Sequence, residues 1–418
     1  MRFVRVRGTE DILDLKFYNF VILQAKKHLE TYNFSEIKTP ILEHTKLFIH
    51  SLGEQTDVVS KEMYIFETAG GDSICLRPEA TSGTIRAYLE NHIESKPWKV
   101  WSHGPMFRHE RPQKGRWRQF TQINIEVVNS DSISQDAYFL KMVDSFFKDK
   151  LFLENYVMKL NFLGCSNDRK KHREALASYL EKVKDKICKT CLARKEKNIL
   201  RVFDCKEESC QKLYADAPKL TDFLCDGCAQ EWEKLKELLN ILSVNFVHAP
   251  SLVRGLDYYC KTVFEFTSRE LGAQDAFCAG GRYELGREIG GKEEVPSIGC
   301  AIGMGRLLML LGSVKDKLAI PQEKALHVVI PISIEQQSLS LLIADTMQDS
   351  DLCTDVMLDG GSMKSMMRRA NKIGASYVLV VGEDEQKDGT VSVKNMLTGK
   401  GEKFKQAAVV EAIKNKKI

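Results

Sequence analysis

The residues best suited to bind a polyanion are concentrated between Arg108 and Arg118. This stretch contains five arginine or lysine residues and one acid, Glu110. Pro112 and Gly115 predict a turn, and apolar residues on both sides predict two strands joined by a basic loop. Arginine suits phosphate because its planar guanidinium donates two parallel hydrogen bonds. A phosphate-binding hairpin is one interpretation. A solvated surface hairpin, the commoner fate of a charged run, is the other.

A second pair of reactive side chains, Glu79 and Thr81, follows a predicted hairpin. Segments 63–66 and 73–76 have strand-like sequences and are separated by a glycine-rich turn. Glu79 and Thr81 then precede a helix that is predicted to end near His92. Side chains at this junction could cap the helix or bind the ammonium group of a ligand, and the residues alone favour the cap.

A third group combines one cation with two adjacent aromatic hydroxyls. Arg254, Tyr258 and Tyr259 lie just before the predicted strand 262–266. Neighbouring residues of an extended chain point to opposite sides. We therefore expect at most one of the two tyrosines to face a pocket, unless the strand is broken there. Two half-buried tyrosines of a sheet are the alternative.

Two glycine-containing segments complete the candidate site. Residues 278–283 predict a turn in which the backbone approaches another part of the chain closely. Residues 298–311 predict a glycine-spaced strand that runs into an apolar helix, with room for a flat ligand along the glycines. Arg306 lies near the start of that helix, where the helix dipole disfavours a cation. A phosphate nearby would explain it.

Six cysteines occur in pairs within the charged segment 166–243. Two C-x2-C pairs separated by some tens of residues fit a tetrahedral thiolate zinc site. The expected ligands are Cys188, Cys191, Cys225 and Cys228, with Cys205 and Cys210 as the alternative pair. Four thiolates would make a closed structural site that helps a small insert to fold. Reduced cysteines without a metal are the other interpretation.

The bulk composition excludes some classes of protein. A chain of 418 residues should hold two or three domains. The net charge is only +4, so any nucleic-acid contact must come from local patches. No apolar run reaches the ~18 residues of a membrane span, and the N-terminus lacks the apolar core of a signal peptide. Twelve cysteines without such a signal indicate the cytoplasm, where thiols stay reduced.

Other elements must position these residues. A helix is predicted from about residue 14 to 32, a strand over 34–43, a helix over 136–149 and a strand over 156–162. Pro40 places the strand 34–43 at a sheet edge or an interface. From Lys324 onward, strands alternate with helices, which predicts a small α/β domain. The lysine-rich end of the chain could contact RNA backbone or form a solvated tail.

Together these segments resemble the bacterial-type histidyl-tRNA synthetases, a family of class II aminoacyl-tRNA synthetases, over essentially the whole chain. Phe34–Glu43 resembles motif 1, Phe107–Gln122 resembles motif 2, and the glycine-spaced segment that ends in Arg306 resembles motif 3. Leu252–Tyr259 matches the histidine-specific signature without a change, and residues 278–283 match a second family-typical stretch.

The resemblance implies an α+β fold. Residues 1–165 and 244–320 would form a catalytic domain, an antiparallel sheet flanked by helices. A cysteine-rich helical insertion domain, 166–243, would interrupt it. Residues 321–418 would form an α/β anticodon-binding domain. The family also implies a homodimer, with motif 1 at the interface.

The implied activity is ATP-dependent ligation of L-histidine to tRNA(His) through a histidyl-adenylate, with Mg²⁺. The implied catalytic residues are Arg108, Arg254 and Gln122. The implied histidine-binding residues are Glu79, Thr81, Arg108, Gln122, Glu126, Arg254, Tyr258 and Tyr259. The implied ATP-binding residues are Arg108, Glu110, Arg116 and Arg306. Arg108 would hold the α-phosphate and Arg306 the distal phosphates, while the two tyrosines would line the imidazole pocket.

Three positions depart from the family pattern. Gly305 replaces the acid that usually precedes the motif 3 arginine, Ala80 replaces a common glycine, and Ser102–His103 replaces an aromatic and an apolar residue. The main rival is the non-catalytic regulatory subunit of ATP phosphoribosyltransferase, which should lack the C-terminal module and degrade the histidine signature. A class II synthetase for another amino acid conflicts with the intact signature. A P-loop enzyme is not supported, because no G-x4-G-K-[ST] run occurs.

Overall fold

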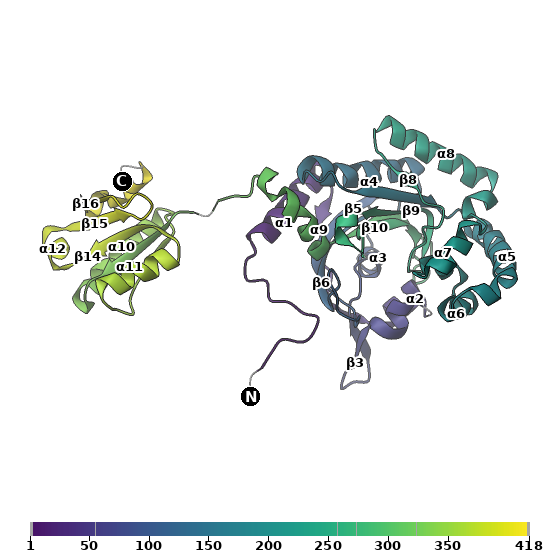
Figure 1. Cartoon of the computed structure of the whole chain (residues 1–418), viewed down its shortest axis with the longest axis horizontal. Helices are drawn as coiled ribbons and strands as arrows, with labels where there is room; N and C mark the ends of the chain where they lie inside the picture. The colour runs from purple at the N-terminus through teal and green to yellow at the C-terminus, as the bar shows by residue number, and fades with distance from the viewer. Residues whose placement is uncertain (1–2, 55, 257, 273, 323, 416–418) are drawn as a thin grey trace. The chain divides into compact units, whose positions relative to one another are not determined.

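An eight-stranded sheet is the framework of the first of two units, residues 1–320; the second comprises 321–418. The computed structural model (Figure 1) describes residues 3–54, 56–256, 258–272, 274–322 and 324–415. In spatial order the strands are β1 (Ser35–Glu36), β5 (Trp98–Phe107), β6 (Gln119–Val128), β11 (Pro296–Gly303), β10 (Ala276–Glu284), β9 (Tyr259–Thr267), β7 (Val157–Phe162) and β8 (Val247–His248). The six inner strands are antiparallel, and β1 and β8 pair parallel with their neighbours.

The predicted basic hairpin is present as β5 and β6, paired from Trp98↔Val128 to Phe107↔Gln119. From Gln122 to Val127 its second strand alternates between polar and apolar residues. Ile123, Ile125 and Val127 enter the hydrophobic core. The polar residues between them therefore point to the opposite face. This alternation decides which face of the sheet can carry a site.

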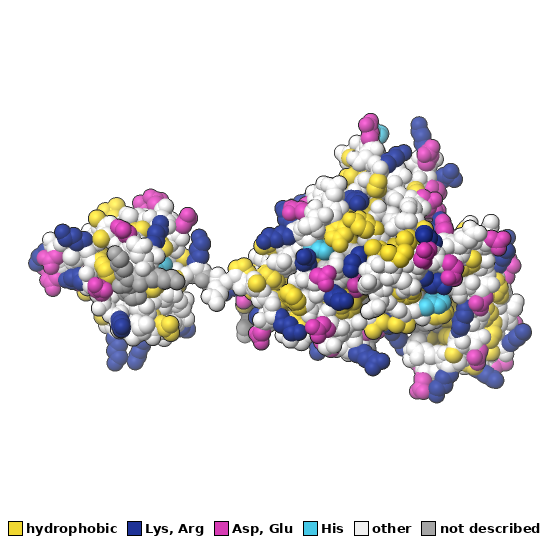
Figure 2. All heavy atoms as spheres, turned by 90° about the horizontal axis from the view of Figure 1, so that it is seen from above, with side chains coloured by type: hydrophobic (Ala, Val, Ile, Leu, Met, Phe, Trp, Pro, Cys, Tyr) yellow, Lys and Arg dark blue, Asp and Glu magenta, His cyan; other side chains and the backbone are white. Residues whose placement is uncertain are grey.

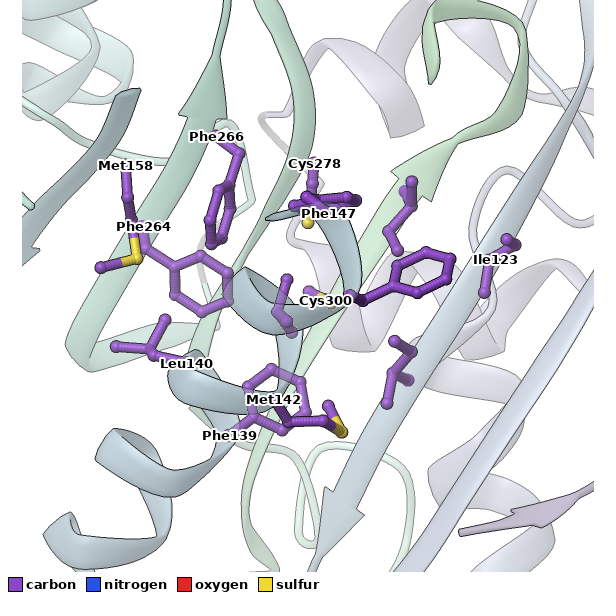
Figure 3. Packing of buried hydrophobic residues seen from close by; sticks show 14 of the residues in the cluster. Ile123, Phe139, Leu140, Met142, Phe147, Met158, Phe264, Phe266, Cys278 and Cys300 are labelled. Atoms are coloured by element: carbon purple, nitrogen blue, oxygen red, sulfur yellow. The ribbon is translucent and has the colours of Figure 1, made fainter. Parts of the chain in front are cut away.

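Four helices pack on the apolar face: α1 (Lys16–Thr31), α4 (Ile133–Ser145), α8 (Asp226–Ile241) and α9 (Met304–Leu311). The core between them and the sheet is rich in aromatic side chains. Figure 3 shows Phe147 beside Cys278, and Phe264 beside Phe266 and Met158. The ring centroids of Phe147 and Phe266 are 5.1 Å apart in an edge-on arrangement, which favours aromatic pairs.

The predicted single strand 34–43 is wrong. The chain forms β1, leaves the sheet, and then enters a separate three-stranded sheet as β2 (Leu42–His44), which pairs with β4 (Ser73–Leu76) and through it with β3 (Tyr64–Glu67). Pro40 lies in the gap and has no N–H for a ladder. The carbonyls of Thr39 and Pro40 instead accept hydrogen bonds from Arg77 Nη1, at 3.1 and 3.4 Å. The small sheet leads into α2 (Thr45–Leu52) and α3 (Thr81–Glu90).

The segment 166–243 is helical, as predicted. It contains α5 (Ser166–Lys182), α6 (Lys189–Lys197), α7 (Glu208–Ala215) and α8. Helices α5 to α7 share a small core of their own, which includes Leu176, Val202 and Tyr214. Helix α8 instead packs into the main core through Trp232 and Leu239. The end of the insert is thus anchored on the sheet that carries the site.

The second unit has the predicted α/β character. Its sheet has the order β13 (Thr354–Val356), β12 (Leu326–Pro331), β14 (Ala375–Val381), β15 (Thr390–Asn395) and β16 (Gly401–Lys405). The first three strands are parallel, and the last two are antiparallel. Helices α10 (Gln337–Asp349), α11 (Met363–Lys372), α12 (Glu383–Asp388) and α13 (Val409–Lys414) complete it. The sequence did not predict α12, β16 or α13. Lys416 and Lys417 of the basic tail lie outside the described residues.

On the face that Figure 2 shows, Lys and Arg side chains are interspersed with Asp and Glu, which agrees with the small net charge. Among the helices that the structure describes, none is long and apolar enough to cross a membrane.

Candidate active site

A cavity of about 620 Å³ lies over the polar face of the sheet. Ten of the eleven predicted catalytic and substrate-binding residues line it: Glu79, Thr81, Arg108, Glu110, Arg116, Gln122, Arg254, Tyr258, Tyr259 and Arg306. They come from segments far apart in the sequence, namely the start of α3, the β5–β6 hairpin, the signature before β9, and the start of α9. Glu126, the remaining predicted residue, lies behind this lining and contacts it through hydrogen bonds.

One end of the cavity is basic. Arg306 Nε donates to the carbonyl of Gly115 at 2.8 Å, and Arg306 Nη2 donates to Gln274 Oε1 at 3.3 Å, so the basic loop is fastened to the start of α9. Arg108 Nε donates to the Pro78 carbonyl at 3.0 Å. Arg108 and Arg306 contact mainly neutral oxygens here, which orient a guanidinium without cancelling its charge.

The arginines at this end repel one another. Burial lowers the pKa of Arg306, and the charges of Arg116 and Arg108 lower it further. Glu110 forms an ion pair with Arg116, which leaves positive charge in excess. Buried charge of one sign is costly unless something balances it. An anion with several charges would balance this excess.

The other end of the cavity is acidic and is built around Glu126. Its two carboxylate oxygens accept hydrogen bonds from the hydroxyls of Thr81 and Tyr283, both at 2.7 Å. Burial raises the pKa of Glu126 to about 8; the two hydroxyls lower it, and the nearby Glu79 carboxylate raises it. A Cβ on Gly299 would occupy the place of the Glu126 carboxylate. The glycine-spaced strand therefore makes room for this acid at position 299, not for a flat ligand.

Glu79 caps α3, as the residues alone favoured. Its carboxylate accepts the backbone N–H of Thr81 at 2.6 Å and that of Ser82 at 3.0 Å. The side chain also lines the cavity and adds to the electrostatic environment of Glu126. The cap fixes a carboxylate at the acidic end without supplying a positive side chain to neutralise it.

Arg254 and two tyrosines lie between these ends. Arg254 is paired with Glu265, and its guanidinium lies over the Tyr259 ring at 5.7 Å. Burial alone would lower the pKa of Arg254, but the Glu265 carboxylate and the tyrosines outweigh it and raise the pKa. Strand β9 begins at Tyr259, so Tyr258 precedes the extended chain. Both tyrosines line the cavity for this reason. Asp257 lies outside the described residues.

Apart from Glu110 Oε2, which is ion-paired with Arg116, three buried polar atoms of the cavity lining have no hydrogen-bond partner among the described residues. They are Gln122 Oε1, Asn124 Nδ2 and Arg254 Nε. An unsatisfied buried group typically costs about 1–3 kcal/mol, and such groups cluster where a ligand completes the bonding. Asn124 was not predicted from the sequence. Its place between Gln122 and Glu126 in the alternating strand was the available signal.

Other cavity residues were missed because they act through partners distant in sequence. Tyr283 holds Glu126, and Glu265 holds Arg254. Residues 278–283, which contain Tyr283, form part of strand β10 and not the predicted turn. The glycines of this stretch do lie against neighbouring backbone, so the predicted close approach is present. The insert also contributes to the lining, with Asp204, Cys205 and Lys206.

The unusual Gly305 lies against an aromatic ring. A Cβ at this position would be 3.0 Å from Cζ3 of the half-buried Trp117. Trp117 belongs to the basic loop, whose backbone is fastened to Arg306. The indole therefore occupies space next to the position where the family usually has an acid.

The cysteines form two groups. The predicted combination of the two C-x2-C pairs is wrong, and the alternative pair, Cys205 and Cys210, lies with the first C-x2-C pair. The sulfur atoms of Cys188, Cys191, Cys205 and Cys210 lie within 4.8 Å of one another. Cys225 and Cys228 lie instead with Cys165 and Asp168. The cause is the packing of the insert: the first C-x2-C pair begins α6, beside the loop before α7, whereas the second begins α8, beside the start of α5.

The chain matches known families along nearly its whole length. Residues 64–315 match the class II core domain of the tRNA synthetases for G, H, P, S and T, and residues 327–416 match an anticodon binding domain. The chain is 40% identical over 412 residues to the histidine–tRNA ligase of Halothermothrix orenii, covering 97% of both chains. It is 41% identical over 410 residues to that of Aquifex aeolicus, covering 97% of this chain and 99% of the relative. The crystal structure of apo S. aureus histidyl-tRNA synthetase superposes with a TM-score of 0.80 at 30% identity, covering 98% of this chain and 99% of that one.

Proposed function

The chain belongs to the histidine–tRNA ligases, a family of class II tRNA synthetases, and we propose that the cavity over its eight-stranded sheet is where it activates histidine with ATP. The enzyme joins L-histidine to tRNA(His) in an ATP-dependent reaction, as its full-length relatives do. The acidic and basic ends of the cavity are the observation that supports this site. One cavity holds uncompensated charge of both signs, and histidine with ATP supplies the opposite charge at each end.

Histidine lies with its ammonium group at the acidic end. Glu79, Thr81 and Glu126 receive the ammonium, and the unpartnered Gln122 Oε1 faces the same space. The imidazole lies against Tyr258 and Tyr259. A site that hydrogen-bonds particular substrate groups rejects analogues that lack them, because its own buried polar atoms would then stay unpaired.

The triphosphate lies at the basic end. Arg108 contacts the α-phosphate and the histidine carboxylate, and Arg306 contacts the distal phosphates beside Arg116, which Glu110 orients. A carboxylate oxygen of histidine attacks the α-phosphorus, and the bond to the bridging oxygen of pyrophosphate breaks. Negative charge grows on the α-phosphate oxygens. Fixed guanidiniums, including that of Arg254, stabilise this charge without having to reorganise. Holding both reactants in line supplies much of the remaining acceleration.

The second step transfers histidine to tRNA. A hydroxyl of the terminal ribose attacks the carbonyl carbon of the adenylate, and AMP leaves. Residues 327–416 match an anticodon binding domain, so this unit contacts the anticodon end of the tRNA. Lysines of β15 and β16 suit a phosphate backbone. Because tRNA charging serves protein synthesis, we place the reaction in the cytoplasm.

Magnesium accompanies ATP at the basic end. This ion prefers phosphate oxygens and one or two carboxylates. Asp275 and Glu265 line the cavity, and both carboxylates act on the charge of Arg306. These two carboxylates, which also pair with Lys159 and Arg254, would hold a magnesium ion here. The ion would add positive charge where the leaving pyrophosphate forms.

The four-cysteine group of the insert binds zinc. The sulfurs of Cys188 and Cys205 are 3.8 Å apart, which matches the separation of about 3.8 Å between tetrahedral ligands 2.3 Å from zinc. The backbone N–H of Cys191 donates to the Cys188 sulfur at 3.4 Å, and that of Cys188 donates to the Cys210 sulfur at 3.2 Å. Such bonds stabilise thiolates. Cys205 lines the cavity, so the ion fixes one wall of the active site.

We further propose a homodimer in which motif 1 contributes to the interface. The chain leaves the sheet after β1, and the apolar side chains that follow Pro40 stay in solvent, with Ile41 37% and Leu42 53% exposed. Residues 1–165 and 244–320 form the catalytic domain, 166–243 the insertion domain and 321–418 the anticodon-binding domain. Light scattering during size-exclusion chromatography should give twice the chain mass; a single-chain mass would reject the dimer.

Amino-acid-dependent ATP–pyrophosphate exchange tests the proposed site. The wild-type protein should exchange with histidine and with no other amino acid. Arg254→Ala should lower the exchange by orders of magnitude and stay folded, whereas Arg173→Ala, an exposed arginine of the insert, should leave it unchanged. Near-normal exchange by Arg254→Ala would remove this residue from the site. No exchange with any amino acid by folded wild-type protein would indicate a regulatory role instead.

Metal analysis tests the zinc assignment. Protein purified without chelator should contain zinc, and Cys188→Ser should lose the ion of this group. A total below about 0.2 ions per chain in the wild-type protein would reject zinc, since a structural thiolate site binds it tightly.

A further inference from the structure

The second thiol group, Cys165, Asp168, Cys225 and Cys228, joins the two ends of the insert. Cys165 follows β7 of the main sheet and precedes α5, the first helix of the insert. Cys225 and Cys228 lie at the start of α8, its last helix. The chain between them spans almost the whole insert. A bond among these residues would therefore close the insert at its base.

The donor atoms are close enough to share one ion. The three sulfurs and a carboxylate oxygen of Asp168 all lie within 4.8 Å of one another. Tetrahedral ligands of zinc need separations of about 3.3–3.8 Å, so small side-chain shifts complete the geometry. Asp168 is fully buried, and Cys228 is 5% exposed. Thiolate and carboxylate oxygen are both established zinc ligands.

Backbone contacts hold the carboxylate in place. Asp168 Oδ2 accepts the N–H of Cys165 at 3.1 Å, and Asp168 Oδ1 accepts the N–H of Cys225 at 3.0 Å. Each oxygen has a second lone pair for a metal. Gly164 has φ of +59°, and a Cβ there would lie 2.6 Å from Asp168 Oδ2. The chain is therefore shaped around the carboxylate.

Helix capping explains the Asp168 carboxylate and also the Cys165 sulfur, which accepts the backbone N–H of Asp168, but it does not explain a thiol at Cys225, which makes no side-chain cap hydrogen bond. An acid alone would satisfy both backbone N–H groups. Cys225 is exposed, so burial of a small apolar side chain does not account for a cysteine there. The two contributing segments, C-x2-D and C-x2-C, have equal spacing and each begins a helix. The four-cysteine group has the same arrangement, because its C-x2-C pair begins α6.

We propose that Cys165, Asp168, Cys225 and Cys228 bind a second zinc ion, which closes the base of the insert. Binding replaces three thiol protons, which go to solvent, with three sulfur–zinc bonds. The site then carries net negative charge, and the positive N-terminal ends of α5 and α8 face it. Arg169, whose Nη1 donates to the Gly164 carbonyl at 3.4 Å, lies beside it. The ion would hold α8 against α5 and so keep the insert wall of the active site in position.

Thiol alkylation of the full-length wild-type protein, mapped by mass spectrometry, tests this proposal without activity. Cys225 and Cys353 are both exposed, and Cys353 belongs to the second unit. In zinc-loaded protein the alkylation of Cys225 should be roughly tenfold slower than that of Cys353, because a zinc-bound thiolate is not a free nucleophile. A chelator should abolish the difference. Equal rates for the two cysteines with zinc present, or a slow Cys225 that the chelator does not change, would overturn the proposal.

Two matched variants assign the protection to this group. Cys165→Ser and Cys188→Ser each replace a cysteine at the N-cap of an insert helix with serine, which is a good cap. Cys165→Ser should expose Cys225 to alkylation and lower the zinc content by one ion per chain. Cys188→Ser should leave Cys225 protected. Protection that survives in Cys165→Ser, with unchanged zinc content, would also overturn the proposal.

Discussion

Arg282, within the main sheet, and Arg108 and Arg306, in the cavity over it, differ in how their charge is balanced. Arg282 of β10 is 1% exposed, and its guanidinium forms an ion pair with Asp136 of α4, which is fully buried. It also donates to the carbonyls of Ser130 at 2.6 Å and Ser132 at 3.0 Å. Thr262 donates to the same aspartate at 2.6 Å. Both charges are enclosed and fully bonded.

Arg306 and Arg108 of the cavity have no such carboxylate partner, whereas Arg254 and Arg116 do. Arg306 and Arg108 contact mainly carbonyl oxygens, and the charges of Arg108 and Arg116 lower the pKa of Arg306. A buried ion pair that is complete within the protein serves the structure. A group of like charges that the protein leaves unbalanced awaits a charged ligand. The comparison predicts that the ion pair of Arg282 determines stability and that the unbalanced arginines of the cavity determine activity.

Breaking the complete pair should have the largest effect. Asp136→Ala leaves Arg282 charged and buried without a partner, which should lower the free energy of unfolding by about 3–5 kcal/mol. Urea unfolding measures this. The matched control is Asp131→Ala, because Asp131 Oδ1 is 3.7 Å from Arg282 but the side chain is 64% exposed. The control should cost less than about 1 kcal/mol. Equal losses in the two variants would show that burial does not distinguish these carboxylates.

Removing a cavity arginine should have the opposite profile. Arg306→Met keeps the apolar stem but removes one of three repelling charges, so stability should change by less than about 1 kcal/mol. Histidine-dependent ATP–pyrophosphate exchange should fall roughly 10²–10³-fold, the usual cost of losing one fixed donor to a developing charge. Arg173→Met provides the control for an exposed arginine. Normal exchange by Arg306→Met, or unfolding of this variant, would show that Arg306 has a structural role like that of Arg282.

The acidic end should make histidine binding depend on pH. Because burial raises the pKa of Glu126 from 4.5 to about 8, folding takes up a proton there, and this contribution to stability is lost as the pH rises through about 8. Binding an ammonium group needs the ionised carboxylate. The dissociation constant of histidine should therefore fall about fivefold between pH 7 and pH 8, a range in which free imidazole is mostly neutral.

Calorimetry at several pH values measures this effect. Glu126→Gln cannot ionise, so its histidine affinity should be weaker and nearly flat over the same range. Proton release on binding, measured in two buffers of different ionisation enthalpy, should occur in the wild-type protein and disappear in the variant. Weaker binding by the wild-type protein at pH 8 than at pH 7 would contradict the assigned role.

Sequence patterns predicted what local rules determine. The β5–β6 hairpin follows from the turn residues Pro112 and Gly115 and the apolar segments on both sides, and the start of α9 at motif 3 follows from the glycine-spaced strand that precedes it. The family resemblance predicted which residues line the cavity. Contacts between distant segments could not be predicted this way. Arg77 takes the carbonyls that would have continued the strand 34–43, and packing of the insert helices decides which cysteines meet.

Restoring the usual acid at Gly305 should have the smallest effect. This change tests the comparison directly, because it gives a cavity arginine a carboxylate neighbour. Gly305→Glu places a carboxylate beside Arg306, which would raise its pKa and make it resemble the balanced Arg282. The new Cβ would press on the half-buried Trp117 ring, a contact that should cost about 1 kcal/mol or less where the ring can move. The affinity for ATP, measured by calorimetry, should therefore change less than about fivefold. Adding Trp117→Phe should relieve the contact and restore or improve binding. If Gly305→Glu lost ATP affinity and Trp117→Phe did not restore it, the contact with the ring would not be the cause. The result would mean that ATP binding requires an Arg306 that no neighbouring carboxylate neutralises.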